Sequence, residues 1–337
     1  MNYQKSLMPC FNLHSRRLRL LGLAALFTLG CMTMFAKGSQ QNIATYQPAF
    51  LISDVPGVSP LQDTNLVNAW GISFSPTSPF WISANGTGLA EVYAVTNDDL
   101  GMPHVTKTGL EVAIPGDGTP TGQVFNNTTG FNGDLFIFAS EDGTISGWRG
   151  SLGVAAETLT SRESAVYKGI TLAGTTSNPM LLAANFAEGT VDVYDGSMNL
   201  VGQFSDSSAA AGYAPFNVQV LAGQIFVTFA KQDAAKHDDV GGAGNGLIDI
   251  FDLSSGTFQR FATGTGAGGK LKEINSPWGL ALAPDSFGKH GGELLVGNFG
   301  SGTIMTFTAK GKFKGLLDND RGKTCAPFLS AGDKDLR

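Results

Sequence analysis

A repeat of about 50 residues constrains this chain more than any single motif. Five segments align on an apolar run that contains a glycine or an asparagine. The spacings are 51, 47, 48 and 62 residues between the aligned positions Gly71, Gly122, Gly169, Asn217 and Gly279. Repeats of this length indicate units that each bury an apolar face against their neighbours. The structure of one repeat therefore determines the fold class.

Each repeat has the pattern of four β-strands. Two short apolar runs are followed by a tight turn and by a third run that contains an aromatic residue, as in "EDGTISGW" and "AEGTVDVYD". Glycine supplies the positive φ that such a turn needs. A fourth, more polar run, such as "NLVGQFSD", suits a solvent-facing outer strand. Four strands in each unit predict an all-β fold of the β-propeller class.

The repeats predict five complete blades, at residues 69–116, 120–163, 167–206, 215–264 and 277–318. A further apolar run, "YQPAFLISD" at 46–54, resembles an outer strand. In closed propellers the first strand commonly completes the last blade. We therefore expect a six-bladed design whose sixth blade is truncated, because the atypical tail 319–337 is too short to supply it. A five-bladed ring with a spare strand is the alternative.

The N-terminus has the form of a secretory signal peptide over residues 1–36. Basic residues precede the apolar run "LLGLAALFTLGCMTMFA" at 20–36, which is short for a membrane span. We expect a linker over 37–45 and export to the periplasm or the extracellular space, with no stable membrane span. A lipid anchor at Cys31 is the alternative, although Thr28 stands where such a cleavage box usually has leucine.

Charge and cysteine content narrow the possible partners. The formal net charge is −6, and without residues 1–36 the chain keeps 18 basic and 28 acidic residues, a net charge of −10. An acidic surface repels phosphate backbones, so nucleic acid is not an expected partner. Only Cys325 lies beyond the signal segment, which excludes a disulfide framework.

Several stretches resemble a family of exported bacterial proteins, uncharacterised six-bladed propellers related to the NHL and TolB-like groups. The matching stretches include "DTNLVNAWGISFSP", "FIFASEDGTISGW", "YAPFNVQV", "AKQDAAKHDDVGGAGNGLIDIFD" and "NSPWGLALAPDSFG", and they cover about residues 50–318. The resemblance implies the fold and a further "GLWGL"-type repeat, which is missing after Asp320. It implies no established reaction.

Propeller geometry indicates where a site would lie. The links into each first strand and the turns after each second strand emerge on one face. That face collects polar residues from every repeat: Asn68, Asn85, Ser140, Asn185, Asn217, Lys231, Ser276 and Asn298. The insertion 231–246, "KQDAAKHDDVGGAGNG", brings in Asp233, His237, Asp238 and Asp239. Because so long a link between strands is uncommon without a binding or gating role, we expect it to form a functional rim.

Oxygen ligands on this face suggest a cation site. Asp233, Asp238 and Asp239, together with Asn217, would suit Ca²⁺, which takes six to eight oxygen ligands. The structural alternative is that these residues cap turns, a common role of Asn and Asp. A zinc site would require the widely separated His104, His237 and His290 to converge.

Other motifs lack the context that they need. The stretch "GTGAGGKL" at 264–271 matches two phosphate-binding patterns, but Leu271 follows the lysine and a strand follows the stretch, so no nucleotide site is expected. The chain contains no G-x-S-x-G, H-E-x-x-H or C-x-x-C motif. Trp70 and Trp278 occupy the same repeat position and either line the funnel or pack between blades.

The sequence thus predicts an exported, monomeric propeller of unknown specific function. The favoured hypothesis is a binding platform that uses one face for a small molecule, a glycan or a protein. One alternative is a Ca²⁺-dependent hydrolase or lactonase with its site in the central funnel. A second alternative is a structural scaffold without a pocket.

Overall fold

The computed structural model describes residues 46, 48–265 and 271–318. The chain divides into two compact units, Met1–Asn42 and Ile43–Arg337, and all described residues belong to the second. The predicted signal peptide, the linker and the tail 319–337 lie outside the described residues, as does most of the glycine-rich stretch 264–271. In the described part of the chain, no helix has the length and apolar character to cross a membrane.

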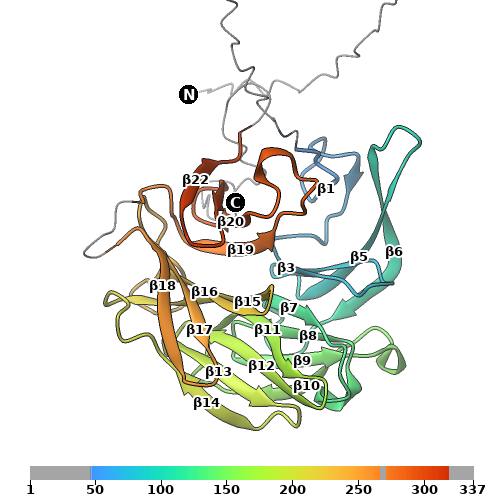
Figure 1. The fold of residues 1–337 in the computed structure, drawn as a ribbon. Coiled ribbons are helices and arrows are strands. Elements are labelled where there is room, and N and C mark those ends of the chain that lie inside the picture. The colour runs from blue at the N-terminus through green and yellow to red at the C-terminus, as the bar shows by residue number, and fades with distance from the viewer. Residues whose placement is uncertain (1–45, 47, 266–270, 319–337) are drawn as a thin grey trace, which may run out of the picture. The chain divides into compact units, whose positions relative to one another are not determined.

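Five sheets of four strands confirm the prediction of an all-β propeller with five blades (Figure 1). Blade 1 contains β3 (Ala69–Ser73), β4 (Phe80–Ala84), β5 (Leu89–Asn97) and β6 (Pro103–Ala113). Blade 2 contains β7 (Pro120–Phe125), β8 (Phe136–Ser140), β9 (Thr144–Trp148) and β10 (Glu157–Ser161). Blade 3 contains β11 (Tyr167–Thr175), β12 (Asn178–Asn185), β13 (Thr190–Asp195) and β14 (Leu200–Phe204). Blade 4 contains β15 (Tyr213–Leu221), β16 (Gln224–Lys231), β17 (Leu247–Asp252) and β18 (Thr257–Thr263). Blade 5 contains β19 (Pro277–Leu282), β20 (Leu294–Asn298), β21 (Ile304–Phe307) and β22 (Phe313–Leu316).

Each blade is an antiparallel meander, and an apolar cluster fills each junction between consecutive blades. Trp81 of blade 1 packs with Phe138 of blade 2, for example, in a cluster that also contains Trp148. Comparable clusters join blades 2 and 3, blades 3 and 4, and blades 4 and 5. A single blade exposes both of its apolar faces, so the blades depend on one another for burial.

The aligned small residues of the repeat permit close packing of the inner strands. A Cβ atom placed on Gly71 would lie 2.5 Å from the carbonyl oxygen of Thr121, and one on Gly122 would lie 2.7 Å from that of Lys168. A Cβ atom on Gly169 would overlap the side chain of Asn217. Real Cβ atoms do not approach other atoms so closely. The repeat is therefore visible in the sequence because successive blades need these residues.

The segment before blade 1 differs from its expected role. Among the described residues of the stretch 46–54, β1 (Ile52–Ser53) is the only strand, and it pairs in parallel with β2 (Leu61–Gln62) instead of joining a blade. Ile52 and Leu61 pack against a cluster of blade 1 that contains Tyr93. The Tyr46 N–H donates to the carbonyl of Asp318 at the end of blade 5. The segment thus contacts both terminal blades, and a sixth blade is not confirmed.

Candidate functional site

One repeat position brings one side chain from each blade to the propeller axis. The residue before the aligned small residue is in turn Trp70, Thr121, Lys168, Phe216 and Trp278. The rings of Trp70 and Trp278 pack edge to face with centroids 4.8 Å apart, and Phe216 contacts both. The two tryptophans are partly buried against each other, so the packing interpretation holds for most of their surface. Lys168 is the charged member of this ring.

Lys168 is fully enclosed, with only 1% of its side chain exposed. Its ammonium contacts the Glu141 carboxylate and lies 3.8 Å from Asp238 Oδ1. It also lies over the aromatic rings of Trp70 and Phe186, at 5.1 and 5.8 Å from their centroids. A buried charge requires such partners, because desolvation strongly disfavours an unpaired ion.

A hydrogen-bonded chain extends from Lys168 to blade 1. The second oxygen of Glu141 accepts from Asn85 Nδ2 at 3.0 Å, and Asn85 Oδ1 accepts from Asn68 Nδ2 at 2.9 Å. Asn68 has the positive φ of 52°, which asparagine tolerates better than most residues. The structure therefore brings together two predicted residues, Asn68 and Asn85, with Glu141 and Lys168, which were not predicted.

The insertion 231–246 of blade 4 covers Lys168 and Glu141. Its base is a short hairpin in which the Val240 N–H donates to the carbonyl of Lys231, and Gln232 bridges to Asp239. At its tip the Asp233 carboxylate accepts from the N–H of His237 at 2.9 Å. This turn places His237 and Asp238 beside Glu141, with the imidazole Nδ1 3.1 Å from Asp238 Oδ1. We call Asn68, Asn85, Glu141, Lys168, His237, Asp238 and Asp239 the axial polar cluster.

The exposed side of the axial polar cluster is acidic. The side chains of His237 and Asp238 are 46% and 56% exposed, whereas Lys168 lies beneath them. Burial raises the pKa of Asp239, against the lowering effects of the Ser276 hydroxyl and the Lys168 ammonium. Three carboxylates surround one ammonium, so the local field attracts cations and hydrogen-bond donors.

Three predicted residues have all their amide atoms engaged within the protein. Asn217 donates to the carbonyl of Trp278 at 2.7 Å and accepts from the N–H of Val218. Asn298 donates to the carbonyl of Glu273 and accepts from the N–H of Asn275. Asn185 belongs to a polar network between blades 2 and 3. These asparagines fit the turn-capping alternative.

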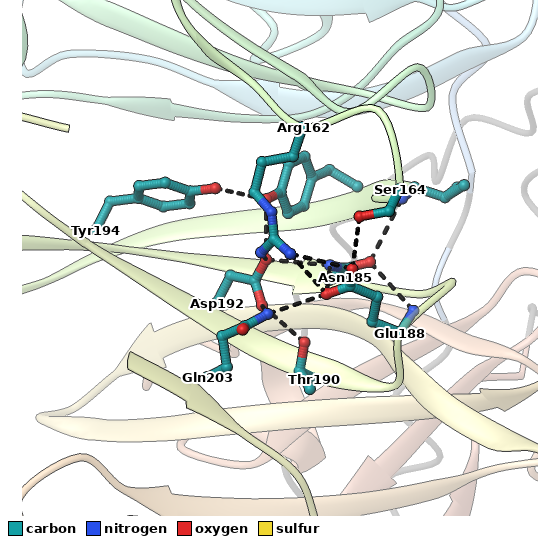
Figure 2. A network of polar contacts seen from close by, with 10 residues as sticks. Arg162, Ser164, Asn185, Glu188, Thr190, Asp192, Tyr194 and Gln203 are labelled. Carbon is teal, nitrogen blue, oxygen red and sulfur yellow. Dashed lines mark hydrogen bonds and ion pairs between the residues drawn. The ribbon is translucent and has the colours of Figure 1, made fainter. Parts of the chain in front are cut away.

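Figure 2 shows the network that contains Asn185. Arg162, in the link after β10, reaches the Asp192 carboxylate at 2.7 Å and also pairs with Glu188. Asn185 donates to both carboxylates, and Tyr167 donates to Asp192 at 2.9 Å. The network thus holds the link after blade 2 against blade 3.

Of the ligands expected for a cation site, Asp238 belongs to the group that the structure brings together. Among the described residues, Glu141, His237 and Asp238 offer ligand atoms that all lie within 4.8 Å of one another. Asn217 has its amide turned to Trp278 and Val218, and Asp233 caps the turn of its own loop. Lys231 is exposed at the end of β16. An imidazole with two carboxylates suits a transition-type divalent ion better than Ca²⁺, which prefers oxygen ligands only.

The sequence contains a signal for Lys168 that is not a motif. Aligning the repeats on the small residue also aligns the residue before it, and a lysine there interrupts a set of mostly aromatic side chains. Glu141 follows the end of β8 as Asn85 follows the end of β4. Neither residue belongs to a motif, because the site is assembled from different blades.

The radial arrangement of four-stranded sheets and the axial cluster together define a β-propeller protein. No family model matches the chain. The chain belongs to the family of "Uncharacterized protein R648" of Acanthamoeba polyphaga mimivirus, to which it is 30% identical over 307 residues, covering 85% of this chain and 72% of that protein.

A second protein of the same virus, "Uncharacterized protein L690", is 29% identical over 300 residues, covering 82% of this chain and 75% of that protein. A solved structure of virginiamycin B lyase from Staphylococcus aureus superposes with a TM-score of 0.47 at 13% identity, over 74% of this chain and 71% of that one. R648 and L690 are viral proteins, whereas the sequence resemblance implied a bacterial family. Both of these relatives are uncharacterised.

Proposed function

We propose that the chain is a ligand-binding propeller whose axial polar cluster binds a small, polar, uncharged or cationic molecule. The observation that supports this most is the convergence of side chains from blades 1 to 4 on buried Lys168. Carboxylates outnumber the ammonium there, which favours hydroxyl or amine groups of a ligand over anions.

The composition of the ring supports a functional role for Lys168. Blades 1, 4 and 5 fill the equivalent position with Trp70, Phe216 and Trp278, which pack as an apolar core. An apolar side chain at residue 168 would satisfy the same packing, and buried ion pairs are often no more stabilising than apolar replacements. A lysine at this position is therefore better explained by binding than by stability.

Unpartnered polar atoms near the cluster support a ligand as well. Within the described residues, Asn68 Oδ1, Trp70 Nε1 and the Ser140 hydroxyl are buried without a hydrogen-bond partner. Asn68 is hydrogen-bonded to Asn85 of the cluster. Ser140 precedes Glu141 in the chain. Such groups are rare in proteins unless a water molecule or a ligand binds them.

The test is a thermal-shift series with glucose, putrescine and citrate as probes. We expect the polyol or the diamine, but not citrate, to raise the Tm of the wild-type chain, since binding to the folded state stabilises it. Glu141→Gln should abolish the shift, while Glu163→Gln, which alters an exposed carboxylate, should retain it. A shift with citrate alone, or a shift that survives Glu141→Gln, would contradict the proposal.

The cluster of Glu141, His237 and Asp238 favours a second candidate, a metal-dependent hydrolase. A divalent ion there would polarise an ester or lactone carbonyl. Lys168 opposes this function, because its ammonium contacts Glu141 where the ion would bind. Titration with Zn²⁺, Mn²⁺ and Ca²⁺ distinguishes the two functions: a metal-dependent Tm rise that His237→Ala removes supports the hydrolase.

We also propose that the protein is exported and monomeric. The signal-like segment 1–36 supports export, and the net charge of −10 without it opposes self-association. N-terminal sequencing of secreted material should find Lys37 first. A scaffold role would be favoured instead if none of these probes and metals binds.

A further inference from the structure

A polar cavity opens where the insertion of blade 4 meets blade 5. Its volume is about 230 Å³. The end of the insertion, the residues that lead into β19 and the turn after β20 contribute to its walls, so it lies on the same propeller face as the axial polar cluster. The polar side chains that line it are those of Lys272, Glu273, Asn275, Ser301 and Thr303.

The cavity presents hydrogen-bonding groups that the protein leaves free. Among the described residues, the Lys272 ammonium and the Glu273 carboxylate form no ion pair, and both side chains are exposed. Asn275 accepts through Oδ1 from a backbone N–H at 2.7 Å, while its Nδ2 has no partner in the described part of the chain. The hydroxyls of Ser301 and Thr303 lie 2.9 Å apart. Donors and acceptors thus occur side by side, and the two opposite charges leave the cavity without net charge.

The cavity adjoins the axial polar cluster. Burial raises the pKa of Asp239, and the Ser276 hydroxyl opposes this rise, so Ser276 lies beside the cluster. Asn275, which lines the cavity, is the preceding residue, and neighbouring Cα atoms are only about 3.8 Å apart. Ala243, on the opposite wall, belongs to the same insertion as Asp239. A ligand longer than one polar unit would therefore contact both places.

The walls of the cavity are held in place by the protein itself. The Gly242 N–H donates to Asn275 Oδ1, and the Ser276 N–H donates to the carbonyl of Asn245 at 2.8 Å. A Cβ atom on Gly300 would overlap the side chain of Asn275, so the turn after β20 packs tightly on this link. A site that is already ordered loses less conformational freedom when a ligand binds.

We propose that the ligand is an oligosaccharide, with one sugar unit at the axial polar cluster and the next unit in this cavity. The proposal rests on the ligand-binding function proposed above and names the class of ligand. Sugar hydroxyls both donate and accept hydrogen bonds, as the mixed groups of the cavity require. A neutral sugar suits a cavity without net charge, whereas a polyamine would bring an ammonium beside Lys272.

Calorimetric titration of the full chain with glucose, cellobiose and maltose tests the proposal. We expect at least one disaccharide to bind about 10-fold more tightly than glucose, because the second unit adds hydrogen bonds. Glu273→Ala removes an acceptor, and Ala243→Phe fills the cavity at an exposed position. Each should reduce the disaccharide affinity to that of glucose and leave the glucose affinity unchanged. Glu163→Ala, at an exposed glutamate away from the cavity, should change neither affinity.

No gain for either disaccharide, or a gain that survives both cavity variants, would overturn the proposal. So would a larger gain from putrescine to spermidine than from glucose to the disaccharides, since the ligand would then be a polyamine. In each of these cases a Tm shift that Glu141→Gln abolishes still supports the ligand-binding function. Disaccharide binding that Glu141→Gln leaves intact would contradict both proposals, because the axial polar cluster would then take no part.

Discussion

A single position of the third strand carries a buried acid in three blades. Glu91, Asp192 and Asp249 have no exposed surface, and each pairs with one basic residue, Lys107, Arg162 or Arg260. Blades 2 and 5 have Ser146 and Thr306 at this position. Buried ion pairs of this kind contribute little net stability, yet the loss of one partner is costly because the other remains as an isolated buried charge.

Arg162→Met should therefore be among the most destabilising single changes. It leaves Asp192 fully buried without its cation, and we expect a loss of about 3–5 kcal/mol in the free energy of unfolding. Urea unfolding followed by circular dichroism measures it. Lys312→Met, at an exposed lysine, provides the control and should cost less than about 0.5 kcal/mol. A loss below about 1 kcal/mol for Arg162→Met would show that the pair is not effectively buried.

Asp249 gives the stability a pH dependence. Burial raises its pKa to about 7, against the lowering effect of Arg260. A carboxyl whose pKa is higher in the folded than in the unfolded state favours folding below its unfolded pKa, and this contribution is lost as the pH rises to about 7. Asp249→Asn should thus flatten the Tm profile between pH 4 and 8, measured by calorimetry. The exposed Glu163→Gln should leave the profile as it is.

At the scale of elements, the glycine turns differ in what surrounds them. Gly143 and Gly189 both have positive φ, 79° and 73°. A Cβ atom on Gly143 would overlap the carbonyl oxygen of Arg162, whereas one on Gly189 would meet no atom within 4 Å. Gly189→Ala should cost only the conformational term, about 1 kcal/mol, and Gly143→Ala clearly more. Urea midpoints of the two variants decide this, and equal losses would contradict it.

The strands were predictable because the signals for them are local. Glycine spacing, apolar runs and turn tetrapeptides lie within each repeat, so the five blades follow from the sequence. The role of Lys168 was not predictable by motif, since its partners Glu141 and Asp238 come from other blades. Asn185 and Asn298 show the reverse case: their positions indicated a site, but local hydrogen bonds account for their amides.

The pairing in the segment before blade 1 is hard to predict for a related reason. An apolar run such as 46–54 indicates a strand, but it does not indicate the partner of that strand. In the structure β1 pairs with β2, only a few residues further along the chain, while Ile52 and Leu61 pack on blade 1. The run is apolar because it covers the face of a blade.

At the scale of the whole molecule, the shared clusters predict cooperative unfolding. Phe138 is fully buried between blades 1 and 2 with Trp81 and Trp148. Phe138→Ala should cost about 3–5 kcal/mol and shift the entire transition, because no blade keeps its core alone. Tryptophan fluorescence and far-ultraviolet circular dichroism should give coincident curves. Two separate transitions would show that the terminal blades unfold independently.

The pairing of Arg162 with Asp192 ties blade 3 to the blade before it. The cation lies in the link after the last strand of blade 2 and the anion lies in blade 3, so these two blades are matched to each other. Blades that share a backbone are therefore not interchangeable parts. If the five blades were joined in another order, so that blade 3 no longer followed blade 2, Arg162 and Asp192 would each lose the partner of opposite charge. A circular permutation that keeps the order would preserve the pair.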